Sequence, residues 1–143
     1  MIVGLQEEFG IPVVMTLTIL GAESSLGDPR LGGESAKNHN YGCLKYGGTQ
    51  TPWGALSSGK ATFKGADWYV FPDAATGVRA WGLYISQGPT WKPGFYLRSY
   101  PNWEDIAAVY YGESVAGFAD YLENLRGLAN KFSTGLRLAG FHV

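Results

Sequence analysis

The sequence predicts an α+β fold in which helices predominate, and two patterns carry this prediction. In the last third of the chain, apolar residues recur at three- and four-residue spacing, as they do in a helix buried along one face. Residues 60–71 instead gather β-branched and aromatic residues on both sides of Lys64-Gly65, which is typical of a β-hairpin. A chain of 143 residues has the length of one domain with one core, so we take residues 1–143 as a single domain.

Two helices are expected before the hairpin. Residues 2–9 form a short helix that Gly10 ends, and Pro12 suits the first turn of a second helix over 12–24. This second segment is apolar on all sides, as a buried central helix is, although its β-branched residues also fit a strand. Residues 27–59 are rich in Gly, Ser, Asn and Pro, so we expect a loop, and a loop this long usually has a function.

Three helices are expected after the hairpin. Asp73 can cap the first, which runs to about Ser86. A turn-rich stretch follows, and Asn102 then begins the second helix, with Asp105 at the third position as in a capping box. Ser114 starts the last and longest helix, whose apolar stripe we assign to the core. The residues of this stripe are Phe118, Tyr121, Leu122, Leu125, Leu128, Phe132 and Leu136.

Glu23 is the most informative single residue. It follows the strongly apolar stretch 11–22 and precedes a segment rich in small and turn-forming residues. On the last turn of a buried helix, a carboxyl group is partly removed from water, which raises its pKa and keeps it protonated near neutral pH. A general acid requires this state. The alternative is a glutamate that ends a helix and faces water.

Three segments carry a resemblance to a known family. They are Ala22–Gly27 (AESSLG), Lys37–Gly42 (KNHNYG), and Tyr69–Asp73 (YVFPD) leading into Ala80–Tyr84 (AWGLY). In this order they resemble the glucosaminidase-type peptidoglycan hydrolases, glycoside hydrolase family 73 and relatives, within the lysozyme-like superfamily. The first segment is similar to the motif that holds the family's catalytic glutamate. The second resembles the Asn-rich run that lines the cleft facing it.

The resemblance implies a lysozyme-like helical domain with a small β-hairpin lobe, and it favours a helix over a strand for 12–24. It implies an endo-β-N-acetylglucosaminidase that cleaves β-1,4 bonds of the bacterial cell wall, with Glu23 as general acid. An N-acetylmuramidase or a lytic transglycosylase of the same superfamily is the first alternative. A non-catalytic wall-binding or phage structural module is the second, although such a module has no need of a half-buried acid.

The second catalytic group is left open. Relatives place another acid on the β region, where this chain offers only Asp67, and Glu34 in the preceding loop is a further candidate. If neither serves, the substrate's own N-acetyl group can act as nucleophile. Tyr110 and Tyr111 match the place of a cleft tyrosine in the family, and one hydroxyl would then orient the acetamido group or the attacking water. The alternative places one ring in the core and the other on the surface.

Sugar subsites are expected to consist of amide and aromatic side chains. Aromatic residues make up 15% of the chain, with five Trp and nine Tyr, and such rings suit the faces of sugars. Asn38 and Asn40 are the candidates for pairing with acetamido groups. The candidate stacking platforms are Tyr41, Trp53, Trp68, Tyr69, Trp91 and Tyr96.

Charge and hydropathy exclude several partners. A formal net charge of −1 gives no basic footprint for nucleic acid or for an anionic membrane surface. Residues 11–22 are too few to span a bilayer, and Glu7 and Glu8 interrupt any signal-peptide apolar region. The partner that the resemblance implies is the glycan strand of peptidoglycan, bound by a monomer. Without a signal peptide, the chain is expected to be a phage endolysin or one module of a larger secreted protein.

Cysteine and histidine chemistry receives little support. Cys43 is the only cysteine, so no intrachain disulfide can form. A Cys43 nucleophile with His39 as its base is an alternative, but no third orienting group is evident. The two histidines and one cysteine are too scattered for a metal site, and no cofactor is expected.

Overall fold

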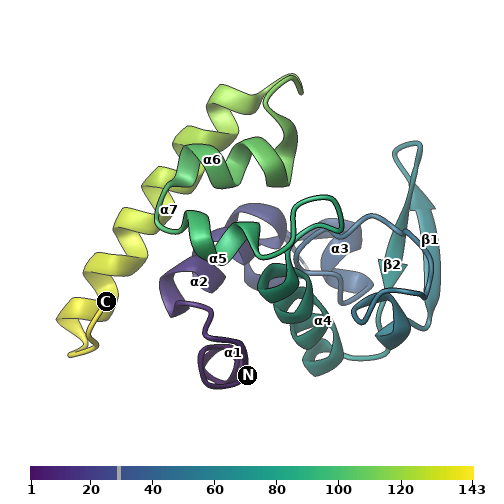
Figure 1. The fold of residues 1–143 in the computed structure, drawn as a ribbon, viewed down its shortest axis with the longest axis horizontal. Coiled ribbons are helices and arrows are strands. Elements are labelled where there is room, and N and C mark those ends of the chain that lie inside the picture. The colour runs from purple at the N-terminus through teal and green to yellow at the C-terminus, as the bar shows by residue number, and fades with distance from the viewer. Residues whose placement is uncertain (29) are drawn as a thin grey trace.

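The structure is a computed structural model that describes residues 1–28 and 30–143. Over these residues the fold is mainly helical with one two-stranded antiparallel sheet, which confirms the fold class at that level. The hairpin and the long C-terminal helix α7 (Phe118–Leu138) lie at opposite ends of the long axis, with α2 (Val13–Ser24) between them (Figure 1). None of the described helices is both long enough and apolar enough to cross a membrane.

The two expected N-terminal helices are confirmed. Helix α1 (Ile2–Phe9) ends at Gly10, whose φ of 70° is readily adopted only by glycine. Pro12 is the N-cap of α2, immediately before its first turn. Most of α2 is buried, including Met15 and Ile19, and the helix packs against α1 and α7. It is therefore the central helix, and it carries Glu23 on its last turn.

The expected loop over 27–59 is wrong in part, because it contains two short helices, α3 (Gly33–Lys37) and a 3₁₀ turn η2 (Gly54–Leu56). Another 3₁₀ turn, η1 (Ser25–Gly27), follows α2 directly, and α5 (Phe95–Ser99) lies in the turn-rich stretch after the hairpin. Helices this short are not stable by propensity alone. Burial holds them instead, through Ser35 and Ala36 in α3 and through Phe95 and Tyr96 in α5.

The hairpin is confirmed with its turn at the predicted residues. Strands β1 (Gly59–Phe63) and β2 (Ala66–Val70) pair in antiparallel fashion, with Ala61 opposite Trp68. Lys64 and Gly65 both have positive φ, 52° and 73°, as the right-handed twist of a two-residue hairpin requires. The segment around Lys45 runs beside β2 and adds an isolated antiparallel bridge between Lys45 and Trp68.

Helix α4 (Ala74–Gln87) begins as predicted. Asp73 Oδ1 accepts a 2.8 Å hydrogen bond from the backbone N–H of Thr76, so the carboxylate is used as a cap. Trp81 and Ile85 on this helix are fully buried in the main core. That core joins α2, β2, α4, α5 and α6 (Trp103–Ala107), and its largest fully buried side chains are Trp81, Tyr69, Tyr96 and Phe71.

The last two predicted helices need correction at their junction. Asn102 caps α6 (Trp103–Ala107) by accepting from the backbone N–H of Asp105 at 3.1 Å, but its own N–H donates to Ser99, so the capping box is not reciprocal. Helix α6 continues into a π-helical turn η3 (Ala108–Gly112). Helix α7 does not start at Ser114 but at Phe118, since Gly117 in the left-handed conformation ends a turn there.

Candidate active site

A pocket of about 450 Å³ opens between the hairpin side of the molecule and the π-helical turn η3. Glu23 and Cys43 line it beneath, Lys45 and Trp68 line it from the β region, and Tyr110 and Tyr111 from η3. Its remaining lining residues are Leu44, Trp53, Tyr84 and Val115. The pocket thus brings together six of the residues singled out from the sequence, namely Glu23, Cys43, Trp53, Trp68, Tyr110 and Tyr111.

Glu23 occupies the predicted position at the edge of the core. Helix α2 ends directly after it, because Ser25 adopts a left-handed conformation and Ser24 folds its hydroxyl back onto the carbonyl of Leu20. Burial raises the pKa of the Glu23 carboxyl, while hydrogen bonds from Tyr121 and Cys43 act in the opposite direction. The carboxyl is therefore half-buried at the pocket and favours its protonated form more than an exposed glutamate does.

Tyr121 is a site residue that the sequence analysis missed. It was assigned to the core stripe of α7, but its hydroxyl donates a 2.5 Å hydrogen bond to Glu23 Oε1. Burial raises the pKa of Tyr121, and the nearby Glu23 charge raises it further, so the hydroxyl remains a donor. The ring stacks on Tyr111, with centroids 4.3 Å apart. Helical spacing identifies Tyr121 only as a residue whose ring packs on the core. It gives no sign that the hydroxyl of the same side chain reaches Glu23 on another helix.

Tyr110 lines the pocket, but its hydroxyl is engaged within the protein. It donates to the carbonyl of Gly42 and accepts a 3.2 Å hydrogen bond from Trp81 Nε1. Gly42 has to be glycine here, because a Cβ atom would lie 2.1 Å from the Trp81 ring. Tyr111 differs: its hydroxyl donates to the carbonyl of Ala116, which fixes the turn before α7. Through its bond to Gly42, Tyr110 links η3 to the loop that contains Gly42 and the pocket-lining Cys43.

Neither candidate for the second carboxylate lies among the residues that line the pocket. Glu34 is exposed on α3 and forms a 2.8 Å ion pair with Lys37. Asp67 is held by Lys60 and by the hydroxyl of Thr62, both at 2.5 Å. It also precedes the pocket-lining Trp68 on β2, and adjacent strand residues point to opposite faces. Within the described residues, Glu23 is the only carboxylate that lines this pocket.

The Asn-rich run has a structural role for the most part. Asn40 is buried; its amide donates to the carbonyls of Leu44 and Tyr69, and its carbonyl accepts from the N–H of Leu44. These bonds tie the chain at Asn40 and Leu44 to Tyr69 on β2, so the Asn40 side chain is not free to bind a ligand. The Nδ2 of Asn38 is buried and finds no hydrogen-bond partner among the described residues. Neither asparagine lines the pocket, so the predicted pairing with acetamido groups has no support there.

The predicted aromatic platforms divide into two groups. Trp53 and Trp68 line the pocket together with Tyr84, which was not predicted. Tyr41, Tyr69, Trp91 and Tyr96 do not line it. Of these, Tyr69 and Tyr96 are buried with bonded hydroxyls, Tyr41 bonds to His39, and Trp91 is exposed elsewhere. The rings that face the pocket extend from β2 across the 3₁₀ turn at Trp53 to α4 and η3.

Cys43 and His39 do not form a catalytic pair. The Cys43 thiol lies 3.0 Å from the hydroxyl of Ser35 and 3.4 Å from the backbone oxygen of Glu23, whereas His39 Nδ1 bonds to Tyr41. Burial, followed by the Glu23 charge, raises the pKa of this thiol to about 12, so it is not a thiolate near neutral pH. Among the residues described, no cluster of three His, Cys, Asp or Glu side chains is arranged to hold a metal ion.

Comparisons with protein-family models, with curated proteins and with solved structures return no match for this chain. The pocket is therefore the feature of this chain that bears on its function. Its elements are one half-buried carboxyl group, a tyrosine hydroxyl bonded to that group, and a wall of aromatic rings.

Proposed function

We propose that this protein has a lysozyme-like fold and is a peptidoglycan glycosidase that acts on the bacterial cell wall, with Glu23 as its general acid. The observation that carries the proposal is the position of Glu23. It lies at the end of the buried helix α2, half-buried in an aromatic-lined pocket, with its pKa raised by burial. Cleavage of a glycosidic bond needs a proton for the leaving oxygen, and a carboxyl of raised pKa supplies it.

The Tyr121 bond orients this acid. Because Tyr121 donates to Oε1, that oxygen acts as an acceptor, and the proton to be transferred resides on Oε2. Proton transfer to the glycosidic oxygen breaks the C1–O bond and leaves an oxocarbenium-like sugar. Trp53, Trp68 and Tyr84 present ring faces or edges to the same pocket, where they can pack against the sugar rings.

The lone carboxylate favours a mechanism in which the substrate supplies the second group. Both sugars of peptidoglycan carry a 2-acetamido group, whose carbonyl oxygen attacks C1 as the leaving oxygen is protonated; water then opens the resulting oxazoline. We propose an endo-β-N-acetylglucosaminidase of this kind. A lytic transglycosylase is the second candidate, and the same observation favours it, since it also needs one residue as acid and then base.

End-group analysis tests the proposal. Purified peptidoglycan is digested with the protein and reduced with borohydride, and the new ends are identified by mass spectrometry. Reduced N-acetylglucosamine is the expected result. Reduced N-acetylmuramic acid would indicate a muramidase, and anhydro-muramic ends, which resist reduction, would indicate the transglycosylase. Wall binding without any new ends would reject catalysis and leave a wall-binding module.

A further inference from the structure

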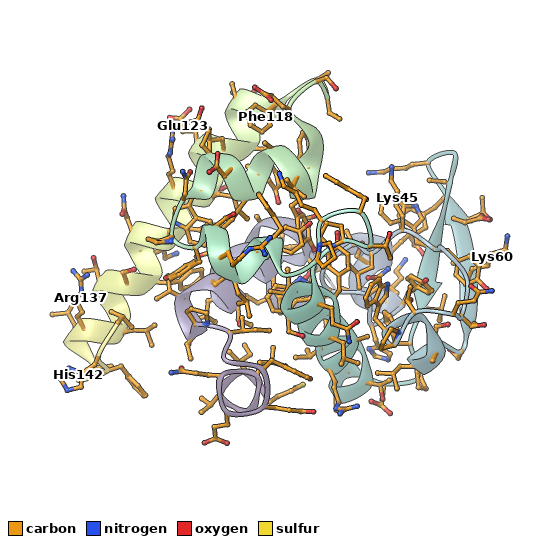
Figure 2. All side chains as sticks on the ribbon, in the orientation of Figure 1. Lys45, Lys60, Phe118, Glu123, Arg137 and His142 are labelled. Carbon is orange, nitrogen blue, oxygen red and sulfur yellow. The ribbon has the colours of Figure 1, made fainter. Side chains whose placement is uncertain are left out.

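Of the described residues that line the pocket, Lys45 is the only cation and Glu23 is the only other charged one. The antiparallel bridge to β2 sets Lys45 opposite Trp68, so both side chains lie on the same face of the β region. The Lys45 ammonium lies 5.8 Å from the centroid of the Trp68 ring. Figure 2 shows Lys45 on the inner side of the hairpin, whereas Lys60 lies at its outer edge.

Within the described residues, Lys45 forms no ion pair with a carboxylate of the protein. Within the described part of the chain, the ion pairs involve other cations, and that of Lys60 with Asp67 accounts for the outer face of the hairpin. The hydrogen bonds received by Glu23 come from Tyr121 and Cys43. Lys45 therefore places a positive charge on the hairpin side of the pocket.

We propose that Lys45 binds a carboxylate carried by the substrate, and that it distinguishes muramic-acid-containing glycan from neutral polymers of N-acetylglucosamine. The inference rests on the proposed function for its substrate. Two sources supply this carboxylate: the lactyl group of N-acetylmuramic acid in peptide-free strands, and the stem peptide in intact peptidoglycan. An ammonium group has three donors and no acceptor, so it suits an anionic substituent better than a neutral acetamido group.

Binding measured without cleavage gives the direct test. In a Glu23→Gln background, calorimetry measures the Kd of three soluble tetrasaccharides: peptide-free alternating glycan, the same glycan with stem peptides, and the N-acetylglucosamine tetramer. Lys45→Met keeps the apolar stem over Trp68 and removes the charge. Lys60→Met removes a charge from the outer face of the same hairpin and serves as the matched control. Lys45→Arg keeps the charge and tests for rescue.

Lys45→Met is expected to weaken binding of at least one muramic glycan about tenfold, the loss of one charge-assisted hydrogen bond. It should change binding of the neutral tetramer less than twofold, and Lys60→Met should change none of the three. Weakening confined to the peptide-bearing glycan would assign the carboxylate to the stem peptide, and weakening confined to the peptide-free glycan would assign it to the lactyl group. Weakening of both would assign it to both sources, because the lactyl carboxyl is an amide wherever a stem peptide is attached.

Two results would overturn the inference. Equal weakening on the neutral tetramer would show that the Lys45 charge does not select a carboxylate, and unchanged binding of both muramic glycans would show no role in binding them. Cleavage by the protein with Glu23 intact is measured separately. If binding depends on the Lys45 charge but no cleavage occurs, the glycosidase proposal is rejected and the Lys45 site is retained. If cleavage occurs but binding does not depend on that charge, the Lys45 site is rejected and the glycosidase proposal is retained.

Discussion

The hydroxyl of Tyr121 on α7 donates a 2.5 Å hydrogen bond to Oε1 of Glu23 on α2, joining two residues 98 positions apart in the sequence. The packing of α7 against α2 makes this contact possible. It fixes one oxygen of the only carboxyl group that lines the pocket within the described residues. The pair therefore connects the helical core directly to the proposed chemistry.

Glu23→Gln should abolish wall lysis. The amide keeps the shape of the side chain but has no proton to transfer, and general acid catalysis contributes about 10²–10⁴-fold. Turbidity loss of purified cell walls measures the rate. Glu34→Gln and Asp67→Asn are the matched controls and should keep nearly full activity, because neither side chain lines the pocket. A Glu23→Gln protein that retained more than about a tenth of the rate would exclude Glu23 as the acid.

The same variant should be more stable than the unmodified protein at neutral pH. Burial raises the pKa of Glu23 above its ordinary value of 4.5, so the native state holds this proton to a higher pH than the unfolded chain does. Stability is then lost as pH rises from the unfolded pKa through the folded one, by about 1.4 kcal/mol per pKa unit of difference. Urea unfolding at pH 4 and pH 7.5 should show the stability gain of Glu23→Gln increasing with pH. A gain independent of pH would contradict this cause.

Tyr121→Phe should shift the pH profile of lysis and lower the rate. The Tyr121 hydrogen bond lowers the pKa of Glu23, so its removal raises that pKa and moves the alkaline limb of kcat/KM to higher pH. Loss of orientation should reduce kcat about tenfold, as expected for one hydrogen bond. Tyr111→Phe is the control, since its hydroxyl bonds to Ala116 and not to Glu23. An unshifted alkaline limb for Tyr121→Phe would leave the residue a structural role only.

Asn40→Ala should destabilise the fold by about 3 kcal/mol, because it removes three hydrogen bonds to buried backbone groups of Leu44 and Tyr69. Asn40→Asp should be similarly harmful, since a carboxylate cannot donate to the two carbonyls. Asn38→Ala should change stability by less than about 1 kcal/mol, because its Nδ2 makes no bond among the described residues. Equal effects of Asn40→Ala and Asn38→Ala on denaturant midpoints would contradict the assigned network.

Cys43→Ser should retain activity within about threefold, whereas loss of a thiol nucleophile would cost several orders of magnitude. The serine hydroxyl can replace the thiol beside Ser35 and the Glu23 carbonyl. Because the pKa of Cys43 is raised to about 12, iodoacetamide at pH 8 should modify the native protein far more slowly than the unfolded chain. Rapid alkylation of the native protein would show that the thiol is less protected than the structure indicates.

The elements recognised correctly from sequence are those with a strong local signal. The Lys64-Gly65 turn needs two residues with positive φ, and Asp73 and Asn102 offer side-chain oxygens to free N–H groups at helix starts. The short helices α3 and α5 were missed, since buried side chains and not propensity hold them. Helix α7 starts later than predicted because Gly117 and the Tyr111 bond to Ala116 extend the turn before it.

The sequence by itself placed an ionisable side chain, Glu23, at the end of an apolar helix, and it left open a buried acid of raised pKa or a glutamate that faces water. Only the tertiary structure decided what surrounds that carboxyl. Tyr121 reaches it from α7, Lys45 is placed beside Trp68 by a bridge to β2, and Asp67 is turned to the other face of the hairpin. Spacing along a chain fixes which face of one element a side chain occupies, whereas contacts between elements distant in sequence depend on how their faces pack.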